Sequence, residues 1–421
     1  VALILHVRPA EEDEAWLRSK WRHGQVKDED DAYLFPSTMQ QDANGTMGVE
    51  ARLRQFFALP WVQRGTPELL LIKRAVRAND NWSSHVAFPG GRRDEEDENG
   101  LYTSMRETWE EVGIDLAEKE FLHVGHLEDR EITSSLGKRL LMILSPYIFL
   151  HLSPFSPTPS LQPSEVSSLH WVPLSQLFTP TPRWGTLHMD VARHMPQNSY
   201  MRSMLSILIG QITFRSIQLP NTPTAITMAM ARDHFAHLAK PPPAKEAEEE
   251  EDTFLLNAEQ QAYLGQVTPR LQLWGLTLGM TLDLLSHMST YQREKPSPEP
   301  PTIHALKSLF SILPSSQLFG DAYSAPAKAP SVVEVFPRFG YPDINLWLWV
   351  FGWRYRAILR KWRQSIGTEL ERQAHWSGLA IAAFYSCVRR ALIVALVLRA
   401  MGLVSLVSLG GYLGWRRLYR L

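Results

Sequence analysis

Three glutamates close together in the chain, Glu107, Glu110 and Glu111, are the residues best suited to chemistry. If residues 106 to 112 are helical, their spacing of i, i+3 and i+4 places the three carboxylates on one face of the helix. Like charges stacked in this way repel one another, so such a face is typical of a site where a cation neutralises them. Carboxylate oxygens are hard ligands that favour Mg²⁺ or Mn²⁺. We therefore predict a magnesium or manganese site on this helix.

A glycine pair lies shortly before the predicted helix. Gly90 and Gly91 follow Pro89, and glycine lets a backbone turn tightly and approach a ligand closely. A carbonyl group in that turn would supply a further oxygen ligand, and Gly113 fits the end of the helix. A magnesium ion held by carboxylates keeps water positions open, bridges phosphate oxygens and lowers the pKa of a bound water. The combination therefore suits phosphate chemistry.

Apolar runs on either side of the glutamates predict the elements that position them. One helix is predicted over 103–112, and a second helical pattern runs from 271 to 285. Residues 1 to about 60 are polar and acid-rich, which indicates one or two helices and little chemistry. Strands interleaved with helices predict a layered α/β domain. The predicted strands are 69–74, 86–88, 121–126, 140–150 and 169–172.

The segment from Phe88 to Ile114 resembles the Nudix box, G-x5-E-x7-R-E-U-x-E-E-x-G-U, in which U is an apolar residue. Its second half, from Arg106 onward, matches, with Thr108 where an aliphatic residue is usual. Counting back from the glycine that ends the box places its first glutamate at Glu98. The first half is one residue longer than the box requires.

The spacing of that first half resembles the coenzyme A pyrophosphatase branch of the Nudix family. That branch reads F-P-G-G, then aspartates, then T-A-x-R-E-x-x-E-E-x-G, which corresponds here to Phe88-Pro-Gly-Gly, Asp94, Asp97 and Thr103 onward. The roles of Asp94, Asp97 and Glu98 stay open, and the alternative is that this acidic run is a solvated loop.

Segments outside the box also resemble that branch. Residues 70–75 are similar to its L-L-x-x-R-S strand, and 82–88 to its x-x-G-x-V-A-F segment, with Ser84 in place of the glycine. Residues 165–174 resemble its E-V-x4-W-V-P-L strand, and 273–277 its closing helix. The resemblance covers about residues 35 to 290 and nothing in 300–421.

The resemblance implies an α/β fold, the Nudix α/β/α sandwich around a mixed sheet. It implies hydrolysis of a nucleoside diphosphate linked to another moiety, by attack of a metal-activated water on phosphorus. The residues that it implicates are Glu107 and Glu111 as main metal ligands, Glu110 as a further ligand or orienter of water, Arg106 as an ion-pairing partner of the glutamates, Glu165 as a general base, and Arg74, Gly90 and Gly91 in substrate binding.

The chain divides by composition into four parts. We expect an N-terminal extension over 1–34, a Nudix domain over 35–290, a proline-rich linker over 291–340 and a helical, aromatic and basic region over 341–421. Prolines and acidic residues in 240–252 cannot bury enough apolar surface to order themselves, which predicts a flexible loop inserted in the domain.

The last 80 or so residues resemble membrane-associated sequence. Residues 346–363 are aromatic and basic, as in interfacial helices. Ala391 to Trp415 is apolar with one charge, Arg399, and is long enough to span a bilayer. Residues 376–388 form a shorter apolar stretch, typical of a re-entrant or interfacial piece. The alternative is a buried helical hairpin of a soluble domain.

Composition sets further bounds. The 421 residues include 43 Lys and Arg against 44 Asp and Glu, a net charge of −1, so no basic excess indicates a nucleic-acid partner. A single cysteine, Cys387, excludes an intramolecular disulfide and a multi-cysteine zinc site. We expect the catalytic domain to face a reducing compartment.

The sequence thus predicts a membrane-associated, Mg²⁺- or Mn²⁺-dependent Nudix pyrophosphohydrolase acting on coenzyme A or its thioesters. One alternative is a Nudix hydrolase for nucleoside diphosphate sugars, dinucleotides or damaged nucleotides. The other is a catalytically weak Nudix binding module that serves as a membrane-tethered scaffold.

Overall fold

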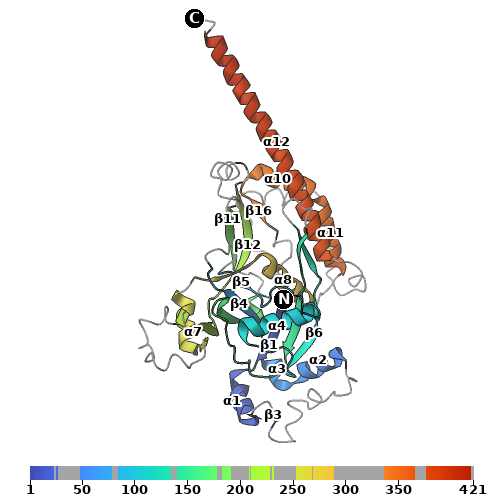
Figure 1. The fold of residues 1–421 in the computed structure, drawn as a ribbon, viewed down its shortest axis with the longest axis vertical. Coiled ribbons are helices and arrows are strands. Elements are labelled where there is room, and N and C mark those ends of the chain that lie inside the picture. The colour runs from blue at the N-terminus through green and yellow to red at the C-terminus, as the bar shows by residue number, and fades with distance from the viewer. Residues whose placement is uncertain are drawn as a thin grey trace, which may run out of the picture.

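A computed structural model of the protein describes residues 1–22, 25–26, 48–77, 84–133, 140–177, 183–190, 208, 210–227, 230–231, 253–267, 269–288, 336–365 and 376–418. The predicted loop at 240–252 and most of the predicted linker at 291–340 lie outside the described residues. Figure 1 shows a body of sheets and helices from which one long helix projects at the C-terminal end.

The centre of the body is a mixed eight-stranded sheet. Its strands follow the order β14-β13-β10-β4-β1-β9-β6, with β5 paired to β4. β1 and β9 run parallel and the other pairs run antiparallel. The bounds are β1 (Ala2–Arg8), β4 (Thr66–Arg74), β5 (Val86–Ala87), β6 (Phe121–His126), β9 (Tyr147–His151), β10 (Val166–Pro173), β13 (Ala225–Thr227) and β14 (Thr253–Leu255).

A helix covers each face of this sheet. Alternate residues of β4 point to opposite faces, so Leu69 and Leu71 join one apolar cluster and Leu70 and Ile72 another. The first cluster includes the buried side of α8 (Gly275–Met288), and the second includes the end of α4 (Gly100–Val112). The layers are therefore helix, mixed sheet and helix, which confirms the predicted α/β/α sandwich.

The first strand corrects the prediction of an N-terminal extension over 1–34. β1 lies between β4 and β9, with Leu5 opposite Leu69 and Leu3 opposite Ile148. Residues 2 to 4 are buried, as the interior of a sheet requires. The acidic helix α1 (Glu11–Lys20) follows. The remaining elements of this region are β2 (Trp21–Arg22), β3 (Gln25–Val26), α2 (Val49–Ala58) and α3 (Pro60–Arg64).

A smaller sheet corrects the second helical prediction. The helix expected from residue 271 begins at Gly275, because Leu271–Trp274 is strand β15. Leu271 and Leu273 are buried while Gln272 between them is half-buried, which is the alternation of a strand. The strand order is β11-β12-β15, with β16 also paired to β12. Their bounds are β11 (Trp184–Asp190), β12 (Gln211–Leu219) and β16 (Arg338–Phe339).

The strand predicted over 140–150 is two strands. β8 (Leu140–Leu144) pairs with β7 (Arg130–Thr133) in a separate ribbon, whereas β9 belongs to the main sheet. The strand is interrupted at Ser145 and Pro146, since proline has no amide hydrogen to donate to a neighbouring strand. A 3-10 helix (Leu174–Gln176) and α7 (Ala258–Val267) complete the described elements of the body.

The described part of the C-terminal region consists of three helices, α10 (Pro342–Phe351), α11 (Trp353–Ser365) and α12 (Trp376–Leu418). The short apolar piece expected at 376–388 is continuous with the following segment in α12, so it is not a separate re-entrant element. Within the described residues, one helical segment, Gly378–Leu413, is long and apolar enough to cross a membrane. The far end of α12 extends away from the body (Figure 1).

Candidate active site

Helix α4 presents the glutamates because both of its ends and its inner face are fixed. Asn99 caps the start, with its Oδ1 accepting from the Tyr102 amide at 2.9 Å. Thr108 and Val112 are fully buried against the sheet. The helix ends at Gly113, whose φ is 68°. The remaining faces carry the glutamates that the sequence singled out.

The glycine turn lies directly against two of those glutamates. The Gly90 amide donates to Glu111 Oε2 at 2.8 Å, and Gly90 has a φ of 141°, a conformation that favours glycine. A side chain at Gly91 would collide with the Glu107 carboxylate. The turn therefore needs glycine at position 90, whereas a side chain at position 91 would displace the Glu107 carboxylate. Its observed contact is an N–H that orients Glu111.

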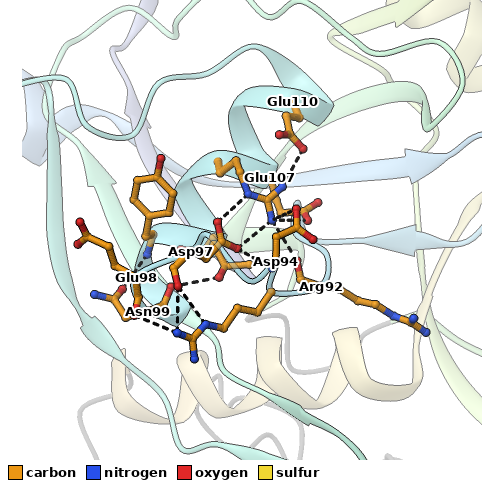
Figure 2. A network of polar contacts seen from close by, with 12 residues as sticks. Arg92, Asp94, Asp97, Glu98, Asn99, Glu107 and Glu110 are labelled. Atoms are coloured by element: carbon orange, nitrogen blue, oxygen red, sulfur yellow. Dashed lines mark hydrogen bonds and ion pairs between the residues drawn. The ribbon is translucent and has the colours of Figure 1, made fainter.

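Arg106 joins the acidic loop to the glutamate helix. Figure 2 shows its partners Asp97, Glu107 and Glu110 close together. Its guanidinium donates to Asp97 at 2.9 and 3.0 Å, to Glu107 at 3.1 Å and to Glu110 at 2.9 Å. Hydrogen bonds from Arg106 hold the pKa of Asp97 well below its usual value. The ion-pairing expected of Arg106 is thus present, and it includes a partner whose role the sequence left open.

The buried acid of the loop is Asp97, and Glu98 is exposed. Counting from the end of the box pointed to Glu98, but Asp97 is the carboxylate that reaches Arg106. Arg93 donates to the main-chain carbonyls of Asp97 and Glu98, at 2.9 and 3.0 Å, and so fixes the loop. The acidic run therefore consists of one buried structural carboxylate among exposed ones. The sequence gives no local signal for it, because its side-chain partner Arg106 lies nine positions further along the chain.

Glu165 reaches the same place from a different part of the chain. It comes just before β10, beside the end of β4, where its carbonyl accepts from the Ala75 amide at 2.8 Å. Arg77 donates to the Glu165 carboxylate at 2.8 Å. The neighbouring loop is bound to the glutamate helix, because the Gln162 amide donates to the Glu111 carbonyl at 3.0 Å. Glu165 is thus positioned from both sides.

The electrostatics show that Glu107, Glu111 and Glu165 share one region. Burial raises the pKa of Glu111 to about 7, and the charges of Glu107 and Glu165 add to this rise. Burial also raises the pKa of Glu107, against the opposing charge of Arg106. Arg74, at the end of β4, lowers the pKa of Glu111 by its charge. The structure therefore brings together all the predicted residues on α4, the glycine turn, Arg74 and Glu165.

The donor chemistry of this region fits a hard divalent cation. Glu107 and Glu111 are largely buried carboxylates with raised pKa values, a state that a nearby cation would relieve. Glu110 is different, because its side chain is 54% exposed and its carboxylate binds Arg106. Across the described residues, no set of three acidic, histidine or cysteine side chains is already arranged around one point. Glu107 and Glu111 are therefore better placed than Glu110 to hold a metal.

The approach to the glycine turn explains one departure from the family pattern. Ser84 stands where the coenzyme A pyrophosphatase branch has glycine, and its φ of 62° is the left-handed conformation that glycine adopts readily. The chain thus keeps the backbone geometry with a serine. Next to it, His85 Nδ1 accepts from the Trp274 indole at 2.9 Å, a packing contact between β15 and this approach. Trp82 lies outside the described residues.

Comparison with protein families matches residues 52–191 to the NUDIX domain. The chain therefore contains a NUDIX domain. The matched segment contains α4, the glycine turn and Glu165, the parts assembled above.

The chain is also similar to other proteins over part of its length. An uncharacterised protein of Schizosaccharomyces pombe is 36% identical over 47% of this chain and 61% of its own length. The peroxisomal coenzyme A diphosphatase ndx-8 of Caenorhabditis elegans is 36% identical over 23% of this chain and 38% of its own. The mitochondrial coenzyme A diphosphatase NUDT8 of Mus musculus is 40% identical over 13% of this chain and 25% of its own. The chain thus spans less than two thirds of the length of each of these relatives.

A solved structure of the NUDIX domain of NrtR from Shewanella oneidensis, in complex with ADP ribose, is also similar. It is 19% identical, covers 26% of this chain and 64% of its own, and has a TM-score of 0.20.

Proposed function

We propose that this protein is a metal-dependent diphosphatase that cleaves a nucleoside diphosphate linked to another moiety, with coenzyme A or acyl-coenzyme A as its substrate class. The observation that carries the proposal is that the buried Glu111 and the half-buried Glu107 both lie against one glycine turn. Such carboxylates are costly to bury without a cation. The coenzyme A diphosphatases among the relatives support the choice of substrate.

Mg²⁺ or Mn²⁺ would be held by Glu107 and Glu111, and the metal supplies charge neutralisation for the phosphates and a lowered pKa for water when it is bound. Gly90 orients the Glu111 carboxylate through its amide, and Arg106 orients Glu107 from the opposite side. Glu110 contributes by holding Arg106 in place through their 2.9 Å contact. The glutamates therefore have fixed rather than freely rotating carboxylates.

Glu165 is proposed as the general base. Its carboxylate would take the proton of the attacking water as the new oxygen–phosphorus bond forms and the bridging oxygen–phosphorus bond breaks. Arg77 holds Glu165, but the Glu165 side chain is 42% exposed, so the base stays accessible to solvent and substrate. Arg74 lies close enough to Glu111 to act on its charge, and its guanidinium is suited to bind a substrate phosphate.

The experiment is product analysis with the full chain. The protein in detergent is incubated with Mg²⁺ or Mn²⁺ and with coenzyme A, acyl-coenzyme A, ADP-ribose, NADH and dinucleoside polyphosphates, and products are identified by mass spectrometry. We expect 3′,5′-ADP and phosphopantetheine from coenzyme A. Glu111→Gln should abolish this turnover, whereas Glu118→Gln, an exposed glutamate beyond α4, should leave it unchanged.

The other results discriminate between the remaining functions. Turnover of ADP-ribose, NADH or a dinucleotide in place of coenzyme A would support the proposed hydrolase activity but contradict the proposed substrate class. Absence of turnover by a folded, metal-supplied protein would favour a Nudix binding module instead. Turnover that persists in Glu111→Gln would contradict the proposed metal site.

We also propose that α12 tethers the catalytic body to a membrane, with the body on the reducing side. The support is the length and apolar composition of Gly378–Leu413. Only 6% of its most apolar 18-residue stretch is buried in the protein. Membrane flotation of the full chain, compared with a chain that ends before α12, tests the tether independently of activity.

A further inference from the structure

Arg399 is the only charged residue of α12 between Arg390 and Arg416, and its charge is satisfied by the body of the protein. Its guanidinium forms a two-point ion pair with Asp343, with Nε to Oδ2 at 2.8 Å and Nη2 to Oδ1 at 2.6 Å. Nη1 donates to the Leu208 carbonyl, and the guanidinium lies 4.3 Å from the centre of the Tyr341 ring. We name this set of contacts the Arg399 clamp.

The clamp is continuous with the smaller sheet. Asp343 lies in the first turn of α10, directly after the strand β16 that pairs with β12. The Gly340 amide donates to the Gln211 carbonyl at 2.8 Å, and Asn345 exchanges hydrogen bonds with the main chain of Phe339 at 2.6 and 3.0 Å. Arg399 is therefore bound to a part of the chain that is itself fixed to the body.

The environment of α12 changes at the clamp. On its N-terminal side, Phe384, Cys387, Ala391 and Ala395 are buried at helical spacing against α10 and α11. On its other side, every residue from 400 to 413 is exposed, although most are apolar; Val404 and Val407 are 66% and 73% exposed. Arg399 is thus the last position at which this helix contacts the body.

We propose that the Arg399 clamp marks the point where α12 enters the membrane, so that residues 400–415 lie in the lipid and residues 376–398 stay packed on the protein. This refines the proposed tether and rests on it. It differs from the span predicted over 391–415, which would place Arg399 within the hydrocarbon. With the clamp at the boundary, the only charge of the segment keeps its protein partners.

Length and flanking residues fit a bilayer as the occupant of the exposed surface. Residues 400–415 extend about 24 Å as a helix, a little less than the roughly 30 Å of a hydrocarbon core. Arg416 follows immediately, and a long arginine side chain can reach the headgroups beyond a short span. At the other end, α10 lies beside the emerging helix (Figure 1) and exposes Leu346 and Val350, and the first residue of α11, Trp353, is also exposed, as in an interfacial element.

Labels on either side of the clamp test this boundary. In a Cys387→Ser background, single cysteines replace Val397 or Val407, two exposed valines of the same helix. Each is labelled with an NBD fluorophore, and the full chain is reconstituted in phosphatidylcholine–phosphatidylserine vesicles. We expect dithionite to quench the label at 397 rapidly and the label at 407 at least tenfold more slowly. Without vesicles, both labels should be quenched at similar rates.

Each other outcome has a separate meaning. Equal protection of both labels in vesicles would overturn the boundary and leave the tether intact. Equal quenching of both would remove the tether. Slow quenching at 407 in detergent-free buffer without vesicles would assign the exposed surface to a second copy of the chain. Hydrolysis of coenzyme A measured on the same samples reports the proposed activity independently of these results.

A variant of the clamp tests its cause. Asp343→Asn removes the countercharge of Arg399 but keeps the side-chain size, and should increase amide hydrogen exchange in α10 and in residues 391–399 several-fold. Asp115→Asn, at an exposed aspartate after α4, is the control. Unchanged exchange in Asp343→Asn would show that apolar packing alone holds the helix, against a clamp at the boundary.

Discussion

Arg106 and Asp97 form a two-point ion pair, with Nε to Oδ1 at 2.9 Å and Nη2 to Oδ2 at 3.0 Å. Asp97 is 3% exposed, and its carboxylate also accepts from the Asp94 amide at 3.0 Å. Because the same guanidinium contacts Glu107 and Glu110, this pair connects the folding of the acidic loop to the direction of the glutamates.

The first prediction concerns Asp97→Ala. Arg106 would lose its strongest partner and would no longer hold Glu107 in one direction, so the affinity for Mn²⁺ should fall about 10- to 100-fold, as for other partners of metal ligands. Titration of Mn²⁺ by calorimetry measures this. Asp97→Glu keeps a carboxylate and should recover part of the loss, and Glu96→Ala, exposed in the same loop, should have no effect. Equal affinities for all three variants would remove the connecting role of Asp97.

The second prediction is that Glu111→Gln stabilises the metal-free protein while it abolishes activity. The folded pKa of Glu111 is raised to about 7, so the folded state binds a proton more tightly than the unfolded state does. The stability that the protonated Glu111 contributes is therefore fully present below the pKa of the unfolded state, and it is lost as the pH rises through about 7. At pH 8 the neutral glutamine should add about 1–3 kcal/mol to the free energy of unfolding.

Denaturant unfolding with and without Mn²⁺ checks this prediction. Added metal stabilises only the protein that binds it, so Mn²⁺ should narrow the difference between the wild type and Glu111→Gln. A loss of stability in the metal-free variant, or equal stabilisation of both proteins by Mn²⁺, would contradict the account of a buried carboxylate that awaits a cation.

The third prediction separates the base from the metal ligands. Glu165→Gln should lower kcat about 10²- to 10⁴-fold with little change in the affinity for Mn²⁺. Arg77→Ala, which removes only the contact that holds Glu165, should have a smaller effect on kcat. Calorimetric titration of Mn²⁺ on the same variants measures the metal affinity. An unchanged kcat in Glu165→Gln would assign the base elsewhere.

The sequence predicted the site better than the fold around it. Glu107 and Glu111 were predictable because helical spacing alone places them together and glycine turns are recognisable. The strand β1 was not, because the acidic helix that follows dominates the composition of the first sixty residues. The strand Leu271–Trp274 was not predictable either. A run of four residues fits the periodicity of a strand or of a helix, and only the left-handed conformation of Gly275 shows that the strand ends there.

Two further residues needed three-dimensional information. Asp97 differs from its exposed acidic neighbours in its burial and in its two-point contact with Arg106, which lies nine positions away. Arg399 lies in a sequence typical of a membrane span. Its ion-pair partner, Asp343, is 56 positions away in the chain, so the sequence does not reveal the pair. Pairings of this kind depend on the tertiary fold, which local periodicity does not encode.

The fourth prediction concerns acid sensitivity. His170 on β10 is buried, and burial lowers its pKa from 6.5 to about 3. The unfolded state therefore binds a proton that the folded state rejects, and stability is lost as the pH falls below 6.5. At pH 5 this costs about 2 kcal/mol relative to neutral pH. Denaturant unfolding between pH 7 and 5 should show a flatter profile of unfolding free energy in His170→Gln than in the wild type. An equally steep profile in both proteins would contradict this prediction.

The fifth prediction tests the attachment of α8 to the β7–β8 ribbon. Arg130 and Asp283 form a buried ion pair at 2.9 Å, with side chains 4% and 3% exposed. Burial lowers the pKa of Arg130 and raises that of Asp283, so each charge depends on the other. Asp283→Ala leaves a buried guanidinium without its countercharge and should cost about 3–5 kcal/mol.

Denaturant unfolding of three variants measures that cost. Arg130→Met combined with Asp283→Leu replaces both charges with apolar side chains and should recover most of the lost stability, because the penalty comes from the unpaired charge and not from the missing pair. Glu50→Ala breaks the exposed pair with Arg54, whose side chains are 80% and 79% exposed, and should cost at most about 0.5 kcal/mol. If the double variant is as unstable as Asp283→Ala, the ion pair itself, rather than the avoidance of an isolated buried charge, stabilises the contact between α8 and the ribbon.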